Sequence, residues 1–504
     1  MEVIIFMNKK YLIALIAILI IICSCAFVLT NSNNSSSSSI NIDTNALEDR
    51  GSLVVDSESL DESNGNYHTD DADVNAILIK NNGALKLADS FVNKTGDTST
   101  SGDDADFYGV NSAILVNTNG SLEISDVEIN TNSKGSNGIF VTNAEASSTD
   151  GGQSSQGSGE GGQPPEAQGS GEGGQPPEAP DGGGAPDGNG GSQPGETTVE
   201  GTTEATIKNV KITTHCDKSR GLDATYNGII NAENVIINTD GQSCAALATD
   251  RGEGQVHVKN SEINTGVSKD SGRGSPLIYS TGNITCENTQ GTSYVSQIAC
   301  IEGKNSIELT NCDLTGYAQG NRQDGDNYVD LGGIFIYQSM SGDADVGTST
   351  FTAKNSNLEI AKESSVYDTA PMFHITNTAC IINLENTGVS FGSGTFLESS
   401  GQNQWGNEGS NGGVCELNTE NEDIEGNVIV DSISSLDWNM KNTAFDGAIN
   451  STGNTTVNVG EGSIWTLTGD SSVSSLELTG NIEYGEFSLT VDGQEYNSSN
   501  PFKG

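Results

Sequence analysis

One short pattern recurs along this sequence and constrains the fold more than any other feature. It is an alternating run of apolar residues, then an Asn or Asp, then a second short alternation, as in residues 121–129 and 205–212. The anchoring residues are Asp126, Asn209, Asn234, Asn260, Asn288, Asn311, Asn355 and Asn386. Successive intervals from Asn209 to Asn311 are 25, 26, 28 and 23 residues. A period of this length, built from strands, predicts a solenoid.

A third short apolar run lies between the anchored segments. Examples are residues 75–79, 112–116, 137–141, 245–248 and 333–336. The turns of two or three residues that join the runs are too short to hold crossover helices. Asn tolerates the left-handed backbone that such turns need, and it stacks in ladders. We therefore expect an all-β fold, a right-handed parallel β-helix with three strands per coil and about ten or eleven coils.

Charge excludes one large class of function. The chain has 504 residues with 68 Asp and Glu against 21 Lys and Arg, a formal net charge of −47. Nucleic-acid binding depends on Lys and Arg that displace counterions from phosphates, so no nucleic-acid partner is expected. The abundance of Gly, 63 residues, also argues against an all-α protein.

The first 30 residues have the layout of an export signal or membrane anchor. Lys9 and Lys10 precede an apolar run over residues 12–22, and Cys25 follows in a context that resembles a lipobox. Apolar character continues to residue 29, which gives 18 residues and would also span a bilayer uncleaved. Lipid attachment at Cys25, a membrane span and cleavage with release all place the rest of the chain outside the cell. Residues 31–50, rich in Ser and Asn, would form a tether.

The remaining chain divides by composition. Anchors Asp126 and Asn209 are 83 residues apart, but residues 144–203 form a tract of Gly, Gln, Pro, Glu and Ser in which GSGEGGQPPEA occurs twice. Without about 58 residues of this tract the interval is one ordinary coil, so we interpret 144–203 as a disordered loop. Coils are then expected at 51–143 and 204–427. The period weakens over 428–504, which would form the last coils and a cap containing Trp438 and Trp465.

Several segments resemble a family of exported adhesin-like, pectin-lyase-fold surface proteins of anaerobic microbes. They are residues 219–226, 246–252, 274–282, 301–307 and 336–344, and residues 465–473 are similar to the last coils of autotransporter passenger domains. The resemblance implies a β-helix displayed on the cell envelope. It implies no reaction. We therefore expect a non-catalytic adhesin or display protein that recognises surface polysaccharides or other extended ligands.

An enzyme is the alternative, because the β-helix also hosts polysaccharide lyases and glycoside hydrolases. The best candidate cluster, in three consecutive coils, is Arg220, Asp223, Asp250, Arg251 and Arg273. Acids and bases on one face could bind a sugar or supply the two carboxylates of a glycosidase. Alternatively, Arg220 with Asp223 and Asp250 with Arg251 could form solvated ion pairs that only hold turns.

No cofactor is expected. Short acidic pairs in loops, such as Asp104 with Asp106 and Asp343 with Asp345, could bind Ca²⁺, although neither EF-hand spacing nor a nonapeptide repeat is present. The cysteines after Cys25 lie at irregular spacing, mostly between apolar neighbours, and are expected to be buried thiols rather than metal ligands.

Overall fold

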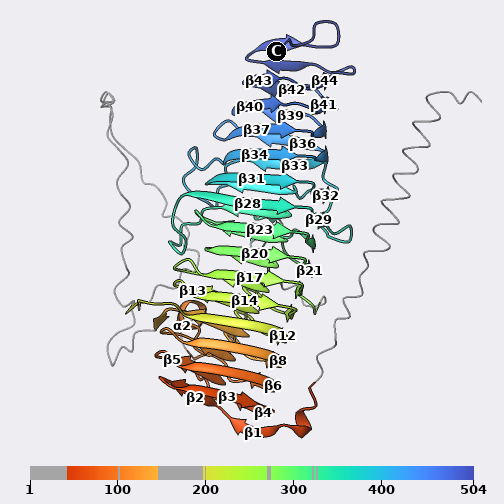
Figure 1. The fold of residues 1–504 in the computed structure, drawn as a ribbon. Coiled ribbons are helices and arrows are strands. Elements are labelled where there is room, and N and C mark those ends of the chain that lie inside the picture. Colours follow the sequence, from red (N-terminus) through yellow and green to blue (C-terminus); the bar gives the residue numbers. More distant parts are fainter. Residues whose placement is uncertain are drawn as a thin grey trace, which may run out of the picture.

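The computed structural model describes residues 42–99, 103–145, 197–198, 200–268, 274–320, 323–324 and 327–503. These residues are nearly all β and form long parallel sheets stacked in an elongated body, the arrangement of a parallel β-helix or solenoid (Figure 1). The prediction of a parallel, all-β stack is confirmed. The segment 1–30 with Cys25, most of the tether, most of the tract 144–203, and Arg273 lie outside the described residues.

One sheet of 16 strands contains the third strand of every coil, and fifteen of its strands run parallel. Its order is β2 (Leu53–Asp56), β5 (Ile77–Lys80), β7 (Ile114–Val116), β9 (Ile139–Thr142), β13 (Leu222–Thr225), β16 (Leu247–Thr249), β19 (Ile278–Ser280), β22 (Ala299–Glu302), β27 (Ile334–Tyr337), β30 (Phe373–Thr376), β33 (Thr395–Ser399), β36 (Asn427–Val430), β39 (Ile449–Ser451), β42 (Ser471–Val473), β45 (Leu489–Val491) and the antiparallel β46 (Gln494–Tyr496). The apolar runs predicted as third strands all lie in it.

A second sheet of 22 strands holds the two segments on either side of each anchor. It contains β1 (Glu48–Gly51), β3 (Ser59–Ser63), β4 (Gly65–Thr69), β6 (Ala84–Lys94), β8 (Ser121–Thr131), β12 (Glu204–Thr214), β14 (Ile229–Glu233), β15 (Ile236–Thr239), β17 (Gln255–Lys259), β18 (Glu262–Thr265), β20 (Asn283–Glu287), β21 (Gln290–Ser293), β23 (Ser306–Thr310), β24 (Asp313–Gly316), β28 (Thr348–Lys354), β29 (Asn357–Ile360), β31 (Ala379–Glu385), β32 (Gly388–Ser390), β34 (Val414–Glu420), β37 (Ser435–Lys441), β40 (Asn454–Val459) and β43 (Ser475–Leu478). The long strand β12 pairs with both β14 and β15, so a coil up to β32 contributes two segments to this sheet, whereas each later coil contributes one.

Smaller elements complete the described chain. A four-stranded parallel sheet contains β35 (Asp423–Glu425), β38 (Ala444–Asp446), β41 (Ile464–Thr466) and β44 (Asn481–Glu483). Two short antiparallel pairs are β10 (Ala144–Glu145) with β11 (Thr197–Thr198), and β25 (Gln323–Asp324) with β26 (Asn327–Tyr328). A 3-10 turn, η1 (Thr44–Ala46), precedes β1, and the helix α2 (Asp103–Tyr108) follows β6. Among the described residues, no helix is long and apolar enough to cross a membrane.

The stack has more coils than the sequence predicts. Fifteen parallel strands in the 16-stranded sheet, at about 4.8 Å each, extend over roughly 65 Å. The prediction of ten or eleven coils is too low because coils near the C-terminus are shorter: paired positions in β34 and β37, Val414 and Ser435, are only 21 residues apart. At the tract 144–203, β8 pairs directly with β12, so this tract interrupts a single coil.

The anchor residues have the conformation that their chemistry predicts. All eight have positive φ, between 49° and 56°. Their side chains form ladders from coil to coil: Asn209 Nδ2 donates to Asp126 Oδ1 at 3.1 Å, and Asn311 Nδ2 donates to Asn288 Oδ1 at 3.1 Å. Three further turn residues, Asp89, Asn421 and Asn442, share the left-handed backbone and were not identified from the sequence.

The interior is a continuous apolar core, and its C-terminal half is filled by a row of aromatic rings. The rings in successive contact are Phe351, Phe373, Phe396, Trp438, Phe445 and Trp465. Trp438 and Trp465 were expected to cover the end of the stack, but both are fully buried inside the coils. Instead, β46 folds back on β45, and Tyr496 and Phe502 pack against the core there.

The 16-stranded sheet is buried on both of its faces in its central part. Every residue of β13, β16, β22, β27 and β30 is buried. Leu222, Leu247 and Ile334 belong to the interior core. Side chains on the other face are covered by chain excursions, among them α2 and the segments that carry Asp343 and Trp405. This covered outer face contains the candidate site.

Candidate functional site

A row of side chains on the outer face of the 16-stranded sheet forms the floor of the site. The strand register places Asp223, Ala248, Tyr279, Cys300, Phe335 and His374 beside one another on β13, β16, β19, β22, β27 and β30. Successive members of this row come from successive coils, about 4.8 Å apart. The row therefore runs along the axis of the stack, and all of its members except the half-buried Tyr279 are buried.

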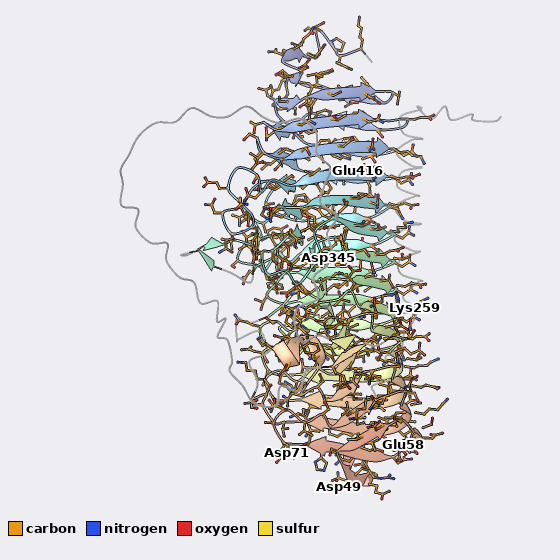
Figure 2. The ribbon with its side chains drawn as sticks, turned by 90° about the vertical axis from the view of Figure 1, so that its left-hand side faces the viewer. Asp49, Glu58, Asp71, Lys259, Asp345 and Glu416 are labelled. Carbon is orange, nitrogen blue, oxygen red and sulfur yellow. The ribbon has the colours of Figure 1, made fainter. Side chains whose placement is uncertain are left out.

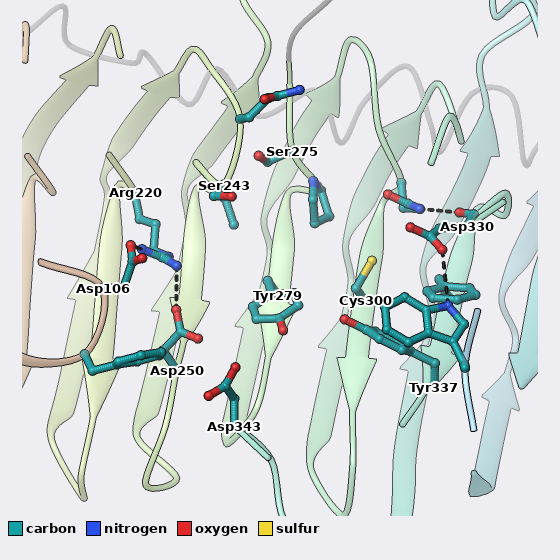
Figure 3. Close-up of a pocket in the computed structure, with 17 residues that line it drawn as sticks. Asp106, Arg220, Ser243, Asp250, Ser275, Tyr279, Cys300, Asp330, Tyr337 and Asp343 are labelled. Atoms are coloured by element: carbon teal, nitrogen blue, oxygen red, sulfur yellow. Dashed lines mark hydrogen bonds and ion pairs between the residues drawn. The ribbon is translucent and has the colours of Figure 1, made fainter. Parts of the chain in front are cut away.

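A cavity of about 420 Å³ lies over this row (Figure 3). We call it the groove. Its lining residues are Asp106, Phe107, Arg220, Gln242, Ser243, Ala245, Asp250, Ser275, Pro276, Tyr279, Gln297, Cys300, Asp330, Phe335, Tyr337, Asp343 and Trp405. Figure 3 shows two chemically different ends: Asp106, Arg220 and Asp250 lie together at one end, and Cys300, Tyr337 and Asp330 lie at the other.

Arg220 organises the charged end of the groove. Its guanidinium contacts three carboxyl groups: Asp250 at 2.7 Å, Asp106 at 3.0 Å and Asp223 at 3.4 Å. Arg220, Asp223 and Asp250 are all buried. Asp106, on α2, also pairs with Lys218 at 2.7 Å. The cluster thus fixes α2 against two neighbouring coils of the stack.

This geometry corrects part of the expected pairing. Arg220 and Asp223 do interact, but the pair is buried rather than solvated. Asp250 pairs with Arg220 of the preceding coil, whereas its sequence neighbour Arg251 pairs with Asp343 at 2.6 Å. The Arg251 guanidinium also lies 3.9 Å from the centre of the Phe107 ring. The wrong pairing arose because Asp250 and Arg251 lie just after β16, where each side chain meets a partner from another segment, Arg220 and Asp343, that sequence spacing does not reveal.

Burial shifts the acid–base properties of this end. Burial raises the pKa of Asp223 to about 7, although Arg220 opposes the shift. Burial also raises the pKa of Asp250 well above its usual value, again against the effect of Arg220. Burial works in the same direction at Asp106, but Arg220 and Lys218 outweigh it and lower the pKa of that carboxyl. One guanidinium cannot keep three buried carboxyl groups ionised, so protonated and ionised acids coexist in the groove.

Aromatic rings line the opposite end. Tyr337 lies with its ring centre 4.7 Å from that of Phe335 and 4.8 Å from that of Trp405. The indole nitrogen of Trp405 donates to Asp330 Oδ1 at 3.3 Å. Together with Cys300, these rings form a buried cluster outside the main core. This end presents apolar ring surface next to a carboxylate acceptor.

Glu302 holds the two tyrosines of the groove in place. The hydroxyls of Tyr279 and Tyr337 donate to Glu302 Oε2 at 2.8 and 3.0 Å, and Ser339 donates to Glu302 Oε1. Glu302 is itself 2% exposed. Burial and the charge of Glu302 raise the pKa of both hydroxyls well above the usual value; Tyr337 adds to the shift at Tyr279, whereas Tyr279 opposes it at Tyr337. Both tyrosines are therefore neutral donors. Each is held at one end by its strand, β19 or β27, and at the other by the hydrogen bond from its hydroxyl to Glu302.

Sequence reasoning found the charged end and missed the aromatic end. Arg220, Asp223 and Asp250 come together as one cluster, Arg251 lies at its edge, and Arg273 lies outside the described residues. The residues that it missed are Tyr279, Glu302, Asp330, Tyr337 and Trp405, and it considered Asp106 only as a ligand for Ca²⁺. A signal was present for some of them: Tyr279 shares the register row of Asp223, and Glu302 pairs with Tyr337 at equivalent strand ends. Trp405 and Asp330 come from excursions whose docking the strand pattern does not encode.

The acidic pairs considered for Ca²⁺ are largely engaged with cations. Asp343 pairs with Arg251, Asp345 lies 3.0 Å from Lys304, and Asp106 pairs with Lys218 and Arg220. Within the described part of the chain, no group of three or more His, Cys, Asp or Glu side chains is placed to hold a metal ion.

The exposed face of the 22-stranded sheet is a second extended surface. It carries a ladder in which Asn439 donates to Asn418 at 3.1 Å and Asn418 donates to Asn383 at 3.0 Å. A depression of about 890 Å³ lies over these residues, flanked by Lys354 and Lys441. Charged side chains continue along the whole stack, as Asp49, Lys259 and Glu416 illustrate in Figure 2. Among the described residues that line this depression there is no aromatic side chain.

Comparison with known proteins gives no further assignment. The sequence matches no known family, and no curated protein is significantly similar to it. Any proposal on function therefore depends on the geometry of the groove.

Proposed function

We propose that the protein is an exported, envelope-anchored surface protein of the adhesin-like, pectin-lyase-fold kind, a right-handed parallel β-helix, and that it recognises glycans. The groove would be the place where part of a sugar chain binds. The observation that carries this proposal is the pairing of a fixed aromatic platform with acidic hydrogen-bonding groups in one cavity.

The chemistry of the groove suits a carbohydrate. A sugar ring has apolar C–H faces, which pack on aromatic rings, and a rim of hydroxyl groups that need acceptors and donors. Tyr337 and Trp405 supply ring surface, while Asp330 and Asp343 supply acceptors. Binding sites generally combine mostly apolar walls with a few well-placed polar groups. Glu302 fixes the tyrosines in advance, which lowers the entropy lost on binding.

The repeat gives the site its extended character. The groove crosses five neighbouring coils, because Arg220, Asp250, Tyr279, Cys300 and Phe335, on or beside β13, β16, β19, β22 and β27, all line it. A polymer whose units repeat along its axis can contact equivalent positions on such a surface. This supports recognition of a chain rather than of a single small molecule.

Retention on immobilised polysaccharides tests the proposal. The full chain should be retained by at least one neutral or acidic glycan of a broad panel, with and without Ca²⁺. Tyr337→Ala removes a ring from the groove and should abolish retention. Tyr294→Ala is the matched control, because the Tyr294 ring pairs with Tyr317 and does not line the groove. Equal retention of both variants, or retention of neither variant nor the parent by any glycan, would contradict the proposal.

One observation favours a second candidate, a polysaccharide lyase or glycoside hydrolase. Asp250 lines the groove, and burial raises its pKa well above the usual value, as a general acid in glycoside hydrolysis requires. Release of new reducing or unsaturated chain ends, lost in Asp250→Asn, would establish the enzyme. A surface that only binds would release none.

A further inference from the structure

We infer that the groove selects uncharged sugar units and rejects uronates. The inference rests on the proposed function and specifies the class of glycan. Three observations carry it: the charges that line the groove, the engagement of its cations, and the kind of hydrogen-bonding group that its walls present.

Carboxyl groups outnumber cations in the lining. Asp106, Asp250, Asp330 and Asp343 line the groove, and among the described lining residues Arg220 is the one basic side chain. Even with Asp250 protonated, as its raised pKa implies, the lining carries more negative than positive charge. A sugar carboxylate placed in the groove would lie close to like charges, which costs free energy in a partly buried site.

The cations near the groove are already paired. Arg220 contacts three carboxyl groups, Lys218 contacts Asp106, and Arg251 contacts Asp343. Recognition of a carboxylate usually employs an Arg that offers two parallel N–H donors. To bind a uronate, Arg220 would have to give up contacts that hold α2 in place. Within the described residues, then, the groove offers a uronate no cation that lacks a carboxylate partner.

The walls instead present acceptors for hydroxyl groups. Ionised carboxylates accept hydrogen bonds and cannot donate them. A primary hydroxyl of a neutral hexose can donate to Asp330 or Asp343, but the carboxylate of the corresponding uronate cannot. Oxidation of the primary alcohol carbon to a carboxylate thus replaces a hydroxyl that can donate to Asp330 or Asp343 with a negative group that these carboxylates repel. The net charge of −47 adds a long-range repulsion of polyanions at low salt.

Matched glycans that differ only at this carbon test the inference. The full chain would be titrated with each neutral glucan, mannan and galactan of the panel and with the same polymer oxidised at its primary hydroxyl to the uronate. We expect the neutral form that binds to bind at least about tenfold more tightly than its uronate in low-salt buffer, and the difference to shrink as salt is added. Equal or tighter binding of the uronate would overturn the inference and leave glycan recognition intact. Binding of neither form of any polymer would overturn the proposed function and this inference with it.

A variant locates the selectivity in the groove. Asp330→Asn removes a charge but keeps an oxygen that can accept from Trp405, so the platform should be preserved. The preference for the neutral polymer should fall by several-fold in this variant. Asp423→Asn, which makes the same change on an exposed strand of the four-stranded sheet, should leave the preference unchanged. The same loss in both variants would show that only overall charge matters and would refute selection by the groove.

Discussion

The guanidinium of Arg220 lies 2.7 Å from the carboxyl group of Asp250, and this buried contact joins two successive coils. The same guanidinium contacts Asp106 on α2, so one side chain links the regular stack to an excursion that covers it. The charged end of the groove therefore depends on a structural ion-pair network. The network also sets the protonation of the acids that a ligand would meet.

Loss of Arg220 should be costly. Arg220→Met leaves Asp106 ionised or forces buried acids to take up protons, and we expect the free energy of unfolding to fall by about 3–5 kcal/mol. Arg50 is the control, since it also pairs with two carboxylates, Glu48 and Glu62, but on the surface. Arg50→Met should cost no more than about 1 kcal/mol. Denaturant unfolding of both variants measures the difference, and similar losses would argue against a buried network.

Glu422 should make stability depend on pH. Burial raises its pKa to about 7 from 4.5, although the Thr387 amide donates to it at 2.8 Å. Between these two values the folded state binds more protons than the unfolded state. This contribution to stability is therefore complete below about pH 4.5 and is lost as the pH rises through 7.

Glu422→Gln removes this titration and keeps an acceptor for Thr387. At pH 8 the variant should be more stable than the parent by about 1–2 kcal/mol, and the advantage should vanish at pH 4.5. Melting temperatures across this range give the comparison. Glu425→Gln, at an exposed position of β35, the strand that follows Glu422, should show no such trend. An advantage that stays constant with pH would contradict the assignment.

An anchor asparagine contributes to stability in two ways, through its left-handed backbone and through its side-chain hydrogen bonds in the ladder. Asn288 has a φ of 50°, donates to Asn260 and accepts from Asn311. Asn288→Gly keeps the left-handed backbone and loses the ladder, whereas Asn288→Ala loses both. We expect Ala to be less stable than Gly by about 1 kcal/mol, the cost of a left-handed non-Gly residue. Thermal unfolding that ranks Ala above Gly would show that the turn does not require this backbone.

Sequence periodicity predicted the stack because strand pairing between coils is local and regular. Each Asn anchor occupies a turn whose backbone few other residues accept, so the anchors identify the coils directly. The count was too low because coils near the C-terminus are shorter and because anchors such as Asp89 and Asn421 were not identified. The tryptophans were misplaced for a related reason: Trp465 lies at an inward position of β41, which periodicity predicts, but nothing local shows that further coils cover it.

The groove was only half predictable. Arg220 and Asp223 are near in sequence and lie on one coil, so their proximity follows from the chain. Trp405 meets Tyr337 only because an excursion folds over the sheet, and excursions have no period. The burial of Asp250 was missed for the same reason, because the excursions that cover it have no period.

Thiol reactivity offers an independent check of the register. Of the seven cysteines in the described chain, six are buried and Cys216 is half-buried. Burial raises the pKa of Cys244 to about 12, and it raises the pKa values of Cys286 and Cys300 well above the usual value of a thiol. In the native protein at pH 7.5, an alkylating reagent should modify Cys216 among these seven, and the others only after unfolding. Rapid labelling of Cys286 or Cys300 in the native protein would contradict the register described for β20 and β22.

Tryptophan fluorescence tests the central claim most directly. The chain has three tryptophans: Trp405 lines the groove, while Trp438 and Trp465 are buried in the core. Titration of the full chain with a retained glycan should change the emission in a saturable way, and Trp405→Phe should abolish the change while the core signal remains. Saturable binding that leaves Trp405 emission untouched, or the same change in the Trp405→Phe variant, would show that the groove is not the glycan site.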